Sequence, residues 1–125
     1  MTTTPMPQPI FLNPTGDAQE IRFRGLKLAS RSNERRGRRR WWIATVYEVE
    51  APASPSARYV IALHGCSAVP GEADTLAVQW FPSFRCPAAA RYLRECSRRG
   101  AHVVADAVRE AGLLPVRDLS EETDG

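Results

Sequence analysis

Residues 31–50 read RSNERRGRRRWWIATVYEVE, an arginine-rich run around Gly37 that leads directly into a segment of alternating side chains. From about Arg40 to Glu50, alternation places Trp41, Ile43, Thr45, Tyr47 and Val49 on one face of a strand and Trp42, Ala44, Val46 and Glu48 on the other. The first set is the more apolar of the two, so we expect it to face the core. Because a glycine among charged residues interrupts the pattern, the run around Gly37 is predicted to form the end of a hairpin.

Strand patterns continue on both sides of this stretch. Before it, a segment from Glu20 alternates Ile21, Phe23 and Gly25 with Arg22, Arg24, Leu26 and Leu28. After it, two prolines in residues 51–56 break the strand, and residues 58–64 follow with apolar side chains on both faces. A fourth segment, Thr75–Phe81, places Leu76, Val78 and Trp80 on one side. The four segments predict a mostly antiparallel sheet with meander connections.

The last third of the chain changes from a period of two to a period of 3.6. Pro87 suits the first turn of a helix and Gly100 its end, while a second apolar stripe runs over about 101–111 before Gly112. The predicted fold is therefore α+β, a four-stranded mostly antiparallel sheet followed by two C-terminal helices packed on one face.

The organisation along the chain follows from length and composition. A chain of 125 residues with 43% hydrophobic residues is sufficient for one domain. Prolines 5, 7, 9 and 14 predict an extended or disordered N-terminal arm over residues 1–19. Residues 20–116 are predicted to form the single α+β domain and residues 117–125 an acidic flexible tail. No signal peptide and no apolar run of about 18 residues is present, so we expect a cytoplasmic protein without a membrane partner, and the odd number of cysteines, three, agrees.

The charge of the chain is unevenly distributed. Residues 20–40 hold nine basic residues against Glu20 and Glu34, a net charge of +7, so the remainder carries −4 within an overall +3. This asymmetry indicates that one end of the domain meets an anionic partner.

The planar guanidinium group of arginine presents N–H donors that match phosphate and carboxylate, and tryptophan rings can stack on bases. We therefore predict a small non-enzymatic binding or regulatory protein that contacts nucleic acid, or alternatively an acidic surface of another protein. A hairpin loop whose arginines are merely solvated is the other interpretation of the same pattern. The predicted binding residues are Arg22, Arg24, Arg31, Arg35, Arg36, Arg38, Arg39, Arg40, Trp41 and Trp42.

Thiol and imidazole groups offer two further hypotheses. The candidate metal ligands are His64, Cys66, Cys86, Cys96 and His102, but no Cys-x-x-Cys pair is present, so we predict no metal and no cofactor. Cys86 precedes Pro87 at the start of a predicted helix, where a thiol pKa falls, and His64 or His102 is a conceivable base. Since no third, orienting group can be named, a thiol-dependent enzyme is the weaker hypothesis.

The order of these elements resembles a family of small, mostly uncharacterised bacterial proteins, the EXLDI proteins, over about residues 21–119. The residues that carry the resemblance are Phe23, Gly25, Leu28 and Ala29, then Tyr47, Tyr59 and Val60, then Ala111-Gly112 and Pro115-Val116-Arg117-Asp118-Leu119. The family's terminal Glu-x-Leu-Asp-Ile is not present here. The resemblance implies an α+β fold and supplies no catalytic residue.

Overall fold

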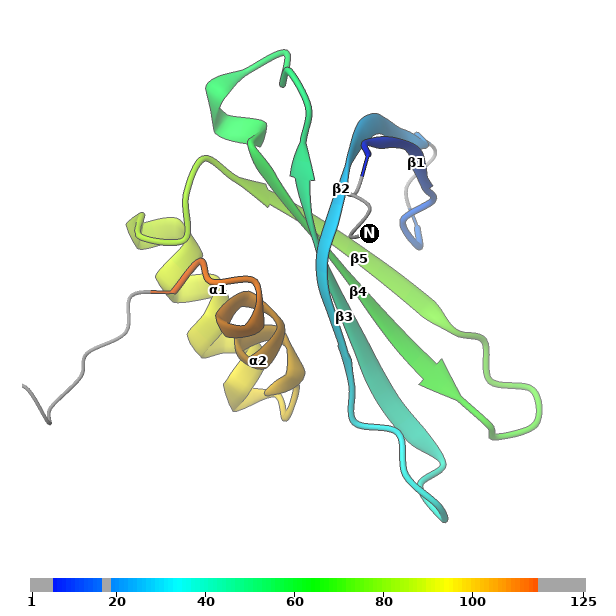
Figure 1. Cartoon of the computed structure of the whole chain (residues 1–125). Helices are drawn as coiled ribbons and strands as arrows, with labels where there is room; N and C mark the ends of the chain where they lie inside the picture. Colours follow the sequence, from blue (N-terminus) through cyan, green and yellow to red (C-terminus); the bar gives the residue numbers. More distant parts are fainter. Residues whose placement is uncertain (1–5, 17–18, 115–125) are drawn as a thin grey trace, which may run out of the picture.

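An antiparallel sheet with its strands in sequential order forms one layer of the protein, and two helices form the other (Figure 1). The structure, a computed structural model, describes residues 6–16 and 19–114. The strands are β1 (Gln8–Leu12), β2 (Ile21–Ser32), β3 (Arg40–Val49), β4 (Tyr59–Ser67) and β5 (Thr75–Phe81), and a short 3₁₀ turn, η1 (Pro55–Ala57), precedes β4. The helices are α1 (Pro87–Arg98) and α2 (Val103–Glu110). The predicted α+β class with an antiparallel sheet and two C-terminal helices is confirmed.

The prediction of four strands is wrong, because the sheet has five. The additional strand, β1, lies within residues 1–19 and pairs antiparallel with β2, with Ile10 opposite Phe23 and Leu12 opposite Ile21. Pro9 is accommodated because β1 is an edge strand, where one face of the backbone needs no ladder partner. The N-terminal arm is therefore part of the sheet over Gln8–Leu12.

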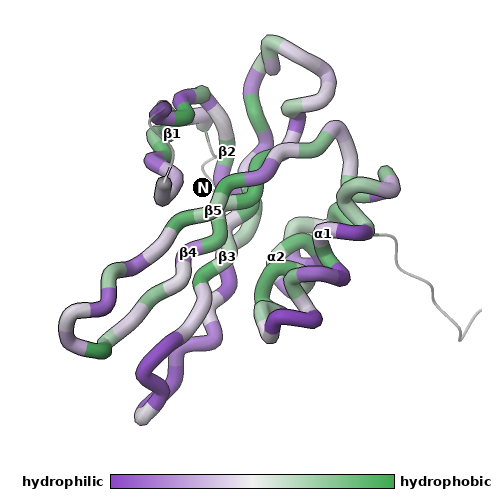
Figure 2. The backbone as a smooth tube through the Cα atoms, turned by 180° about the vertical axis from the view of Figure 1, so that it is seen from behind, coloured by the Kyte–Doolittle hydropathy of each residue, from purple (hydrophilic) through white to green (hydrophobic). Residues whose placement is uncertain are grey.

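The main core lies between the sheet and the helices. Ala44 and Val46 of β3 and Ile61 of β4 are fully buried there against Val104 and Val108 of α2. Figure 2 shows hydrophobic segments where α2 faces the sheet and hydrophilic segments on the outer surface of the helices. Burial of an apolar helix stripe on an apolar sheet face holds the two layers together.

The prediction of which face of β3 enters this core is wrong. The helices cover the face of Trp42, Ala44 and Val46, whereas Tyr47 and Val49 from the other set pack on the opposite face. Both sets are largely apolar, so alternation alone did not discriminate between them. The pairing of β2 with β3 shifts at a bulge between Lys27 and Ala29, and this shift places Ala29 opposite Val46 on the helix side.

The opposite face of the sheet carries a second, smaller core. Leu12 of β1 is buried there with Val60 and Ala62 of β4. Farther along, the Thr15 amide donates to the Leu76 carbonyl at 2.9 Å, and the Leu76 amide donates to Thr15 Oγ1 at 2.7 Å. The chain that leaves β1 at one edge of the sheet thus reaches β5 at the other edge, and it covers part of the second face.

The β2–β3 hairpin ends in a tight turn at the predicted position. The Arg38 amide donates to the Arg35 carbonyl at 3.0 Å, and Gly37 adopts a φ of +87°, a conformation that glycine reaches without strain. Asn33 continues the ladder, because its amide donates to the Trp42 carbonyl at 3.1 Å and its Oδ1 accepts from the Trp42 amide at 2.7 Å. In Figure 1 the hairpin extends past the end of the helix layer.

Among residues 6–16 and 19–114, no helix has the length and apolar character needed to cross a bilayer. The predicted acidic tail, 117–125, lies outside the described residues, as do the last two residues of the predicted domain.

The two-layer arrangement predicts where the fold is most sensitive to truncation. Ile61 is fully buried at the centre of the sheet, so Ile61→Ala should lower the free energy of unfolding by about 2–5 kcal/mol. Lys27→Ala, at an exposed position on β2, is the control and should change it by less than about 0.5 kcal/mol. Urea denaturation followed by circular dichroism measures both, and similar values for the two variants would contradict this packing.

Candidate anion-binding site at the end of the β2–β3 hairpin

The ten residues predicted to bind an anion do not form one surface. Arg22 and Arg24 lie near the start of β2, and Arg35–Arg40 lie beyond its end. With a rise of about 3.3 Å per strand residue, the two groups are separated by roughly 30 Å. The local charge of the sequence window is therefore divided between opposite ends of the sheet.

Carboxylates neutralise the arginines that lie along the strands. Arg22 pairs with Glu20 at 2.8 Å and Arg24 with Glu50 at 3.1 Å. Arg31 on β2 reaches Glu110 at the end of α2, at 3.6 Å. Each of these arginines is more than half exposed, so the pairs contribute little to stability, but they reduce the positive potential around β2.

The arginines of the turn itself are different. Within the described part of the chain, no carboxylate pairs with the guanidinium groups of Arg35, Arg36, Arg38 or Arg39. Three of the four are exposed and Arg38 is half-buried. Figure 2 shows hydrophilic chain on both sides of the tip of this hairpin. The unpaired positive charge of the predicted set is thus concentrated on one short turn.

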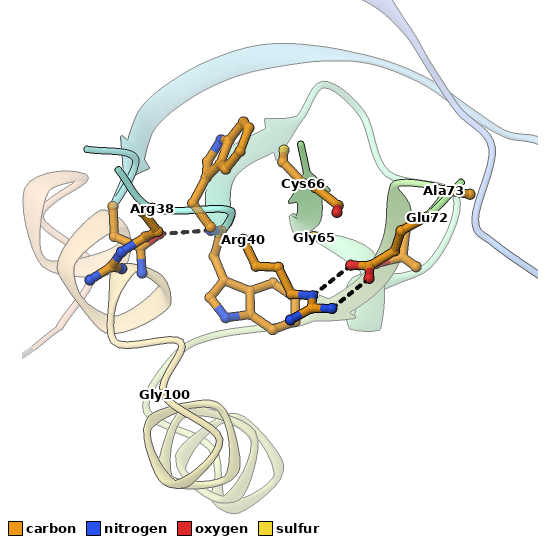
Figure 3. A pocket seen from close by; sticks show the side chains of 12 residues that line it. Arg38, Arg40, Gly65, Cys66, Glu72, Ala73 and Gly100 are labelled. Carbon is orange, nitrogen blue, oxygen red and sulfur yellow. Dashed lines mark hydrogen bonds and ion pairs between the residues drawn. The ribbon is translucent and has the colours of Figure 1, made fainter. Parts of the chain in front are cut away.

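Arg40 links the β2–β3 hairpin to the β4–β5 hairpin. Its Nε and Nη2 donate to the two carboxylate oxygens of Glu72 at 2.7 and 2.6 Å, a bidentate pair shown in Figure 3. The hydrogen bond from Arg40 is the main cause that lowers the pKa of Glu72 from 4.5 to about 2, and the carboxylate in turn raises the pKa of Arg40. Because a guanidinium has five N–H groups, three remain available on Arg40.

The two tryptophans occupy opposite faces of β3. Trp42 packs against the main core, and its cross-strand neighbours are Gly65 on β4 and, next to that, Thr75 on β5. A Cβ atom at position 65 would lie 3.1 Å from Trp42 Cζ3 and 2.5 Å from Thr75 Oγ1, so only glycine lets the indole lie this close to β4. Trp41 is half-buried, and its indole nitrogen has no hydrogen-bond partner among residues 6–16 and 19–114. Trp42, and not Trp41 from the set expected to face the core, is therefore the tryptophan that packs on the main core.

A pocket of about 320 Å³ opens between the two hairpin ends and the connection from α1 to α2 (Figure 3). Arg38, Arg40 and both tryptophans line it, so the structure brings these four predicted residues together. Sequence reasoning missed the other lining residues, which include Asn33, Gly65, Ser67, Glu72, Thr75 and Gly100. Gly65 carried a signal that was overlooked, since a glycine within a strand pattern often marks close approach of another group.

The thiols and imidazoles do not converge. Cys86 lies on the helix side of the sheet, where its Sγ donates to the Ser83 carbonyl at 3.1 Å, whereas His64 lies opposite Leu76 on the other face. His102 follows α1, about 18 Å along the helix axis from Cys86. Burial, followed by the nearby carboxylates Asp74 and Glu34, raises the pKa of the Cys66 thiol, which disfavours the reactive thiolate.

No three His, Cys, Asp or Glu residues in the described ranges group as a metal site. Neither a family model, nor a curated protein, nor a solved structure matches the chain. The resemblance to the EXLDI proteins therefore stays a prediction.

The Arg40–Glu72 pair makes a pH-dependent prediction. A carboxyl group whose pKa is lower in the folded protein stabilises the fold above its unfolded pKa, and this contribution disappears as the pH falls. We expect the Glu72 side chain to titrate near pH 2 in an NMR experiment, and Arg40→Gln to return its midpoint toward 4.5. Arg24→Gln is the control and should leave the Glu72 midpoint unchanged. A midpoint near 4.5 in the unaltered protein would contradict the bidentate pair.

Proposed function

We propose that the protein is a small non-enzymatic nucleic-acid-binding protein that contacts phosphates through Arg35, Arg36, Arg38 and Arg39. One observation carries the proposal: these four guanidinium groups have no carboxylate partner within the described residues, while Arg22, Arg24, Arg31 and Arg40 each have one. A cytoplasmic location and a regulatory role belong to the same proposal.

The chemistry of the turn supports phosphate as the target. Guanidinium groups bind phosphate through two parallel N–H bonds and hold less water than ammonium groups, so little hydration is lost on contact. The turn lies beyond the helix layer (Figure 1), and its Arg35, Arg36 and Arg39 side chains are exposed, so a long polyanion can reach them. A linear array of phosphates can meet several arginines of one hairpin end at once.

Salt dependence gives a quantitative prediction. Each phosphate contact that is removed should reduce the slope of log affinity against log salt concentration by about 0.7–0.9. In the variant with Arg35, Arg36, Arg38 and Arg39 all changed to Gln, we expect the slope for a 20-nucleotide oligonucleotide to fall by about three. Fluorescence anisotropy at salt concentrations from 20 to 200 mM measures it.

The paired arginines provide the matched control for this experiment. Arg22→Gln with Arg24→Gln removes two charges of the same type from the far end of β2, where Glu20 and Glu50 already neutralise them. This variant should keep the slope of the unaltered protein to within about one contact.

Two outcomes would contradict the proposal. If the unaltered protein binds no oligonucleotide at 20 mM salt, nucleic acid is not the partner, and an acidic surface of another protein becomes the better candidate. If the control variant loses as much slope as the turn variant, the contact is spread over the sheet and not made by the turn.

A further inference from the structure

We infer that the pocket between the two hairpin ends accepts one unstacked base, so that the preferred ligand is single-stranded nucleic acid. The inference rests on the proposed function, because it concerns the strand whose phosphates the turn would hold. It adds a second type of contact, made by an aromatic wall and a set of hydrogen-bond donors, which duplex DNA does not reach.

The aromatic wall of the pocket is Trp42. Its indole is placed by contact with Gly65 on one side and by the main core beneath it. The side chain is half-buried, so part of the ring remains open to the pocket. A ring fixed in this way loses little entropy when a base stacks on it, and stacking on an aromatic side chain tolerates any base.

Hydrogen-bond donors line the pocket beside the Glu72 carboxylate, both of whose oxygens already accept from Arg40. Asn33 Oδ1 already accepts from the Trp42 amide, so the NH₂ group of Asn33 is the part left to bind a ligand. Arg40 is held by Glu72 but keeps three N–H groups, and Arg38 has no carboxylate partner in the described ranges. The carbonyl oxygens and ring nitrogens on a base edge are acceptors that suit these donors.

The position of the pocket joins it to the proposed phosphate contacts. Arg38 both lines the pocket and belongs to the turn that carries Arg35, Arg36 and Arg39. A strand whose phosphates follow the turn would therefore pass the pocket with its bases within reach. A volume of about 320 Å³ lies at the lower end of the range of ligand pockets. A base in a duplex would first have to be unstacked and unpaired, which costs free energy that a single strand does not spend.

A competing aromatic site exists on the other face of the sheet. Trp80 of β5 is 49% exposed and lines an apolar pocket with Phe23 and Val49. The arginine in that pocket, Arg22, is paired with Glu20. A base stacked there would lie far from the unpaired arginines, so Trp80 serves as the matched control.

The first experiment uses the unaltered protein and three probes of equal length. These are a 12-nucleotide oligothymidylate, its abasic deoxyribose-phosphate counterpart and a 12-base-pair duplex. At 100 mM salt we expect the oligothymidylate to bind roughly 5- to 100-fold more tightly than the abasic strand, because one stacked base is gained. The bases of the duplex are stacked and paired, so the duplex should not gain this 5- to 100-fold factor over the abasic strand.

The second experiment locates the stacked base. Trp42→Leu removes the ring and should bring the ratio of oligothymidylate to abasic affinity to about one, with the salt slope unchanged, while Trp80→Leu should leave the ratio intact. Because Trp42→Leu also truncates the core, a second variant keeps the test decisive. Trp41→Phe with Trp80→Phe leaves Trp42 as the sole tryptophan, whose fluorescence should be quenched by oligothymidylate and not by the abasic strand.

The outcomes separate this inference from the proposed function. Equal, salt-dependent binding of the three probes overturns the base pocket and leaves the phosphate contacts in place. Loss of the affinity ratio in Trp80→Leu, or absence of quenching in the protein with Trp42 alone, also overturns it, since the base would then stack elsewhere. Failure of all three probes to bind even at 20 mM salt overturns both proposals together.

Discussion

The burial of β4 on both of its faces is the constraint on which the rest of the structure depends. Ile61 and Leu63 face the helices, and Val60 and Ala62, from the same strand, face the opposite side. A strand that is apolar on both faces must be covered twice, because either face left in water would forfeit the hydrophobic gain. The helices cover one face. The β1 strand and Thr15, which bonds to Leu76, cover part of the other, so this part of the N-terminal segment contributes to the second core.

This constraint also explains what the sequence could and could not predict. The sequence predicted four strands, the hairpin end and both helices correctly. In these segments the alternation of side chains, the helical periodicity and the glycines and prolines at the element ends all indicate the same structure. The β1 strand was missed because prolines outweighed the apolar residues Ile10 and Leu12, although an edge strand tolerates proline. Because the β4 sequence is apolar on both faces, it already required that other residues cover the face of the sheet away from the helices. The face of β3 was not predictable, since both of its faces are largely apolar and the choice between them depends on long-range packing.

The candidate site was predictable in its sign but not in its extent. The arginine run identified the turn, yet the charge that remains unpaired depends on partners remote in the sequence, such as Glu110 for Arg31 and Glu72 for Arg40. These partners are brought into place by the docking of α2 and by the register of β4 with β5. The pocket needs the same long-range information, because Trp42 and Gly65 become neighbours only through the pairing of β3 with β4. Local patterns specify residue types and cannot specify cross-strand neighbours.

The distribution of ion pairs has a consequence for how an anion would approach. A surface pair adds little stability, but it replaces the full charge of its arginine by a weak dipole, whereas the field of an unpaired arginine extends over a Debye length of about 8 Å. By pairing Arg22, Arg24 and Arg31, the carboxylates Glu20, Glu50 and Glu110 leave the turn as the main unneutralised part of the basic segment. The four like charges on this turn repel each other, so they do not stabilise the fold. A bound anion would relieve this repulsion and lower the free energy. If the proposed phosphate contact forms at this turn, the Trp42 pocket lies beside it, because Arg38 belongs to both the turn and the pocket.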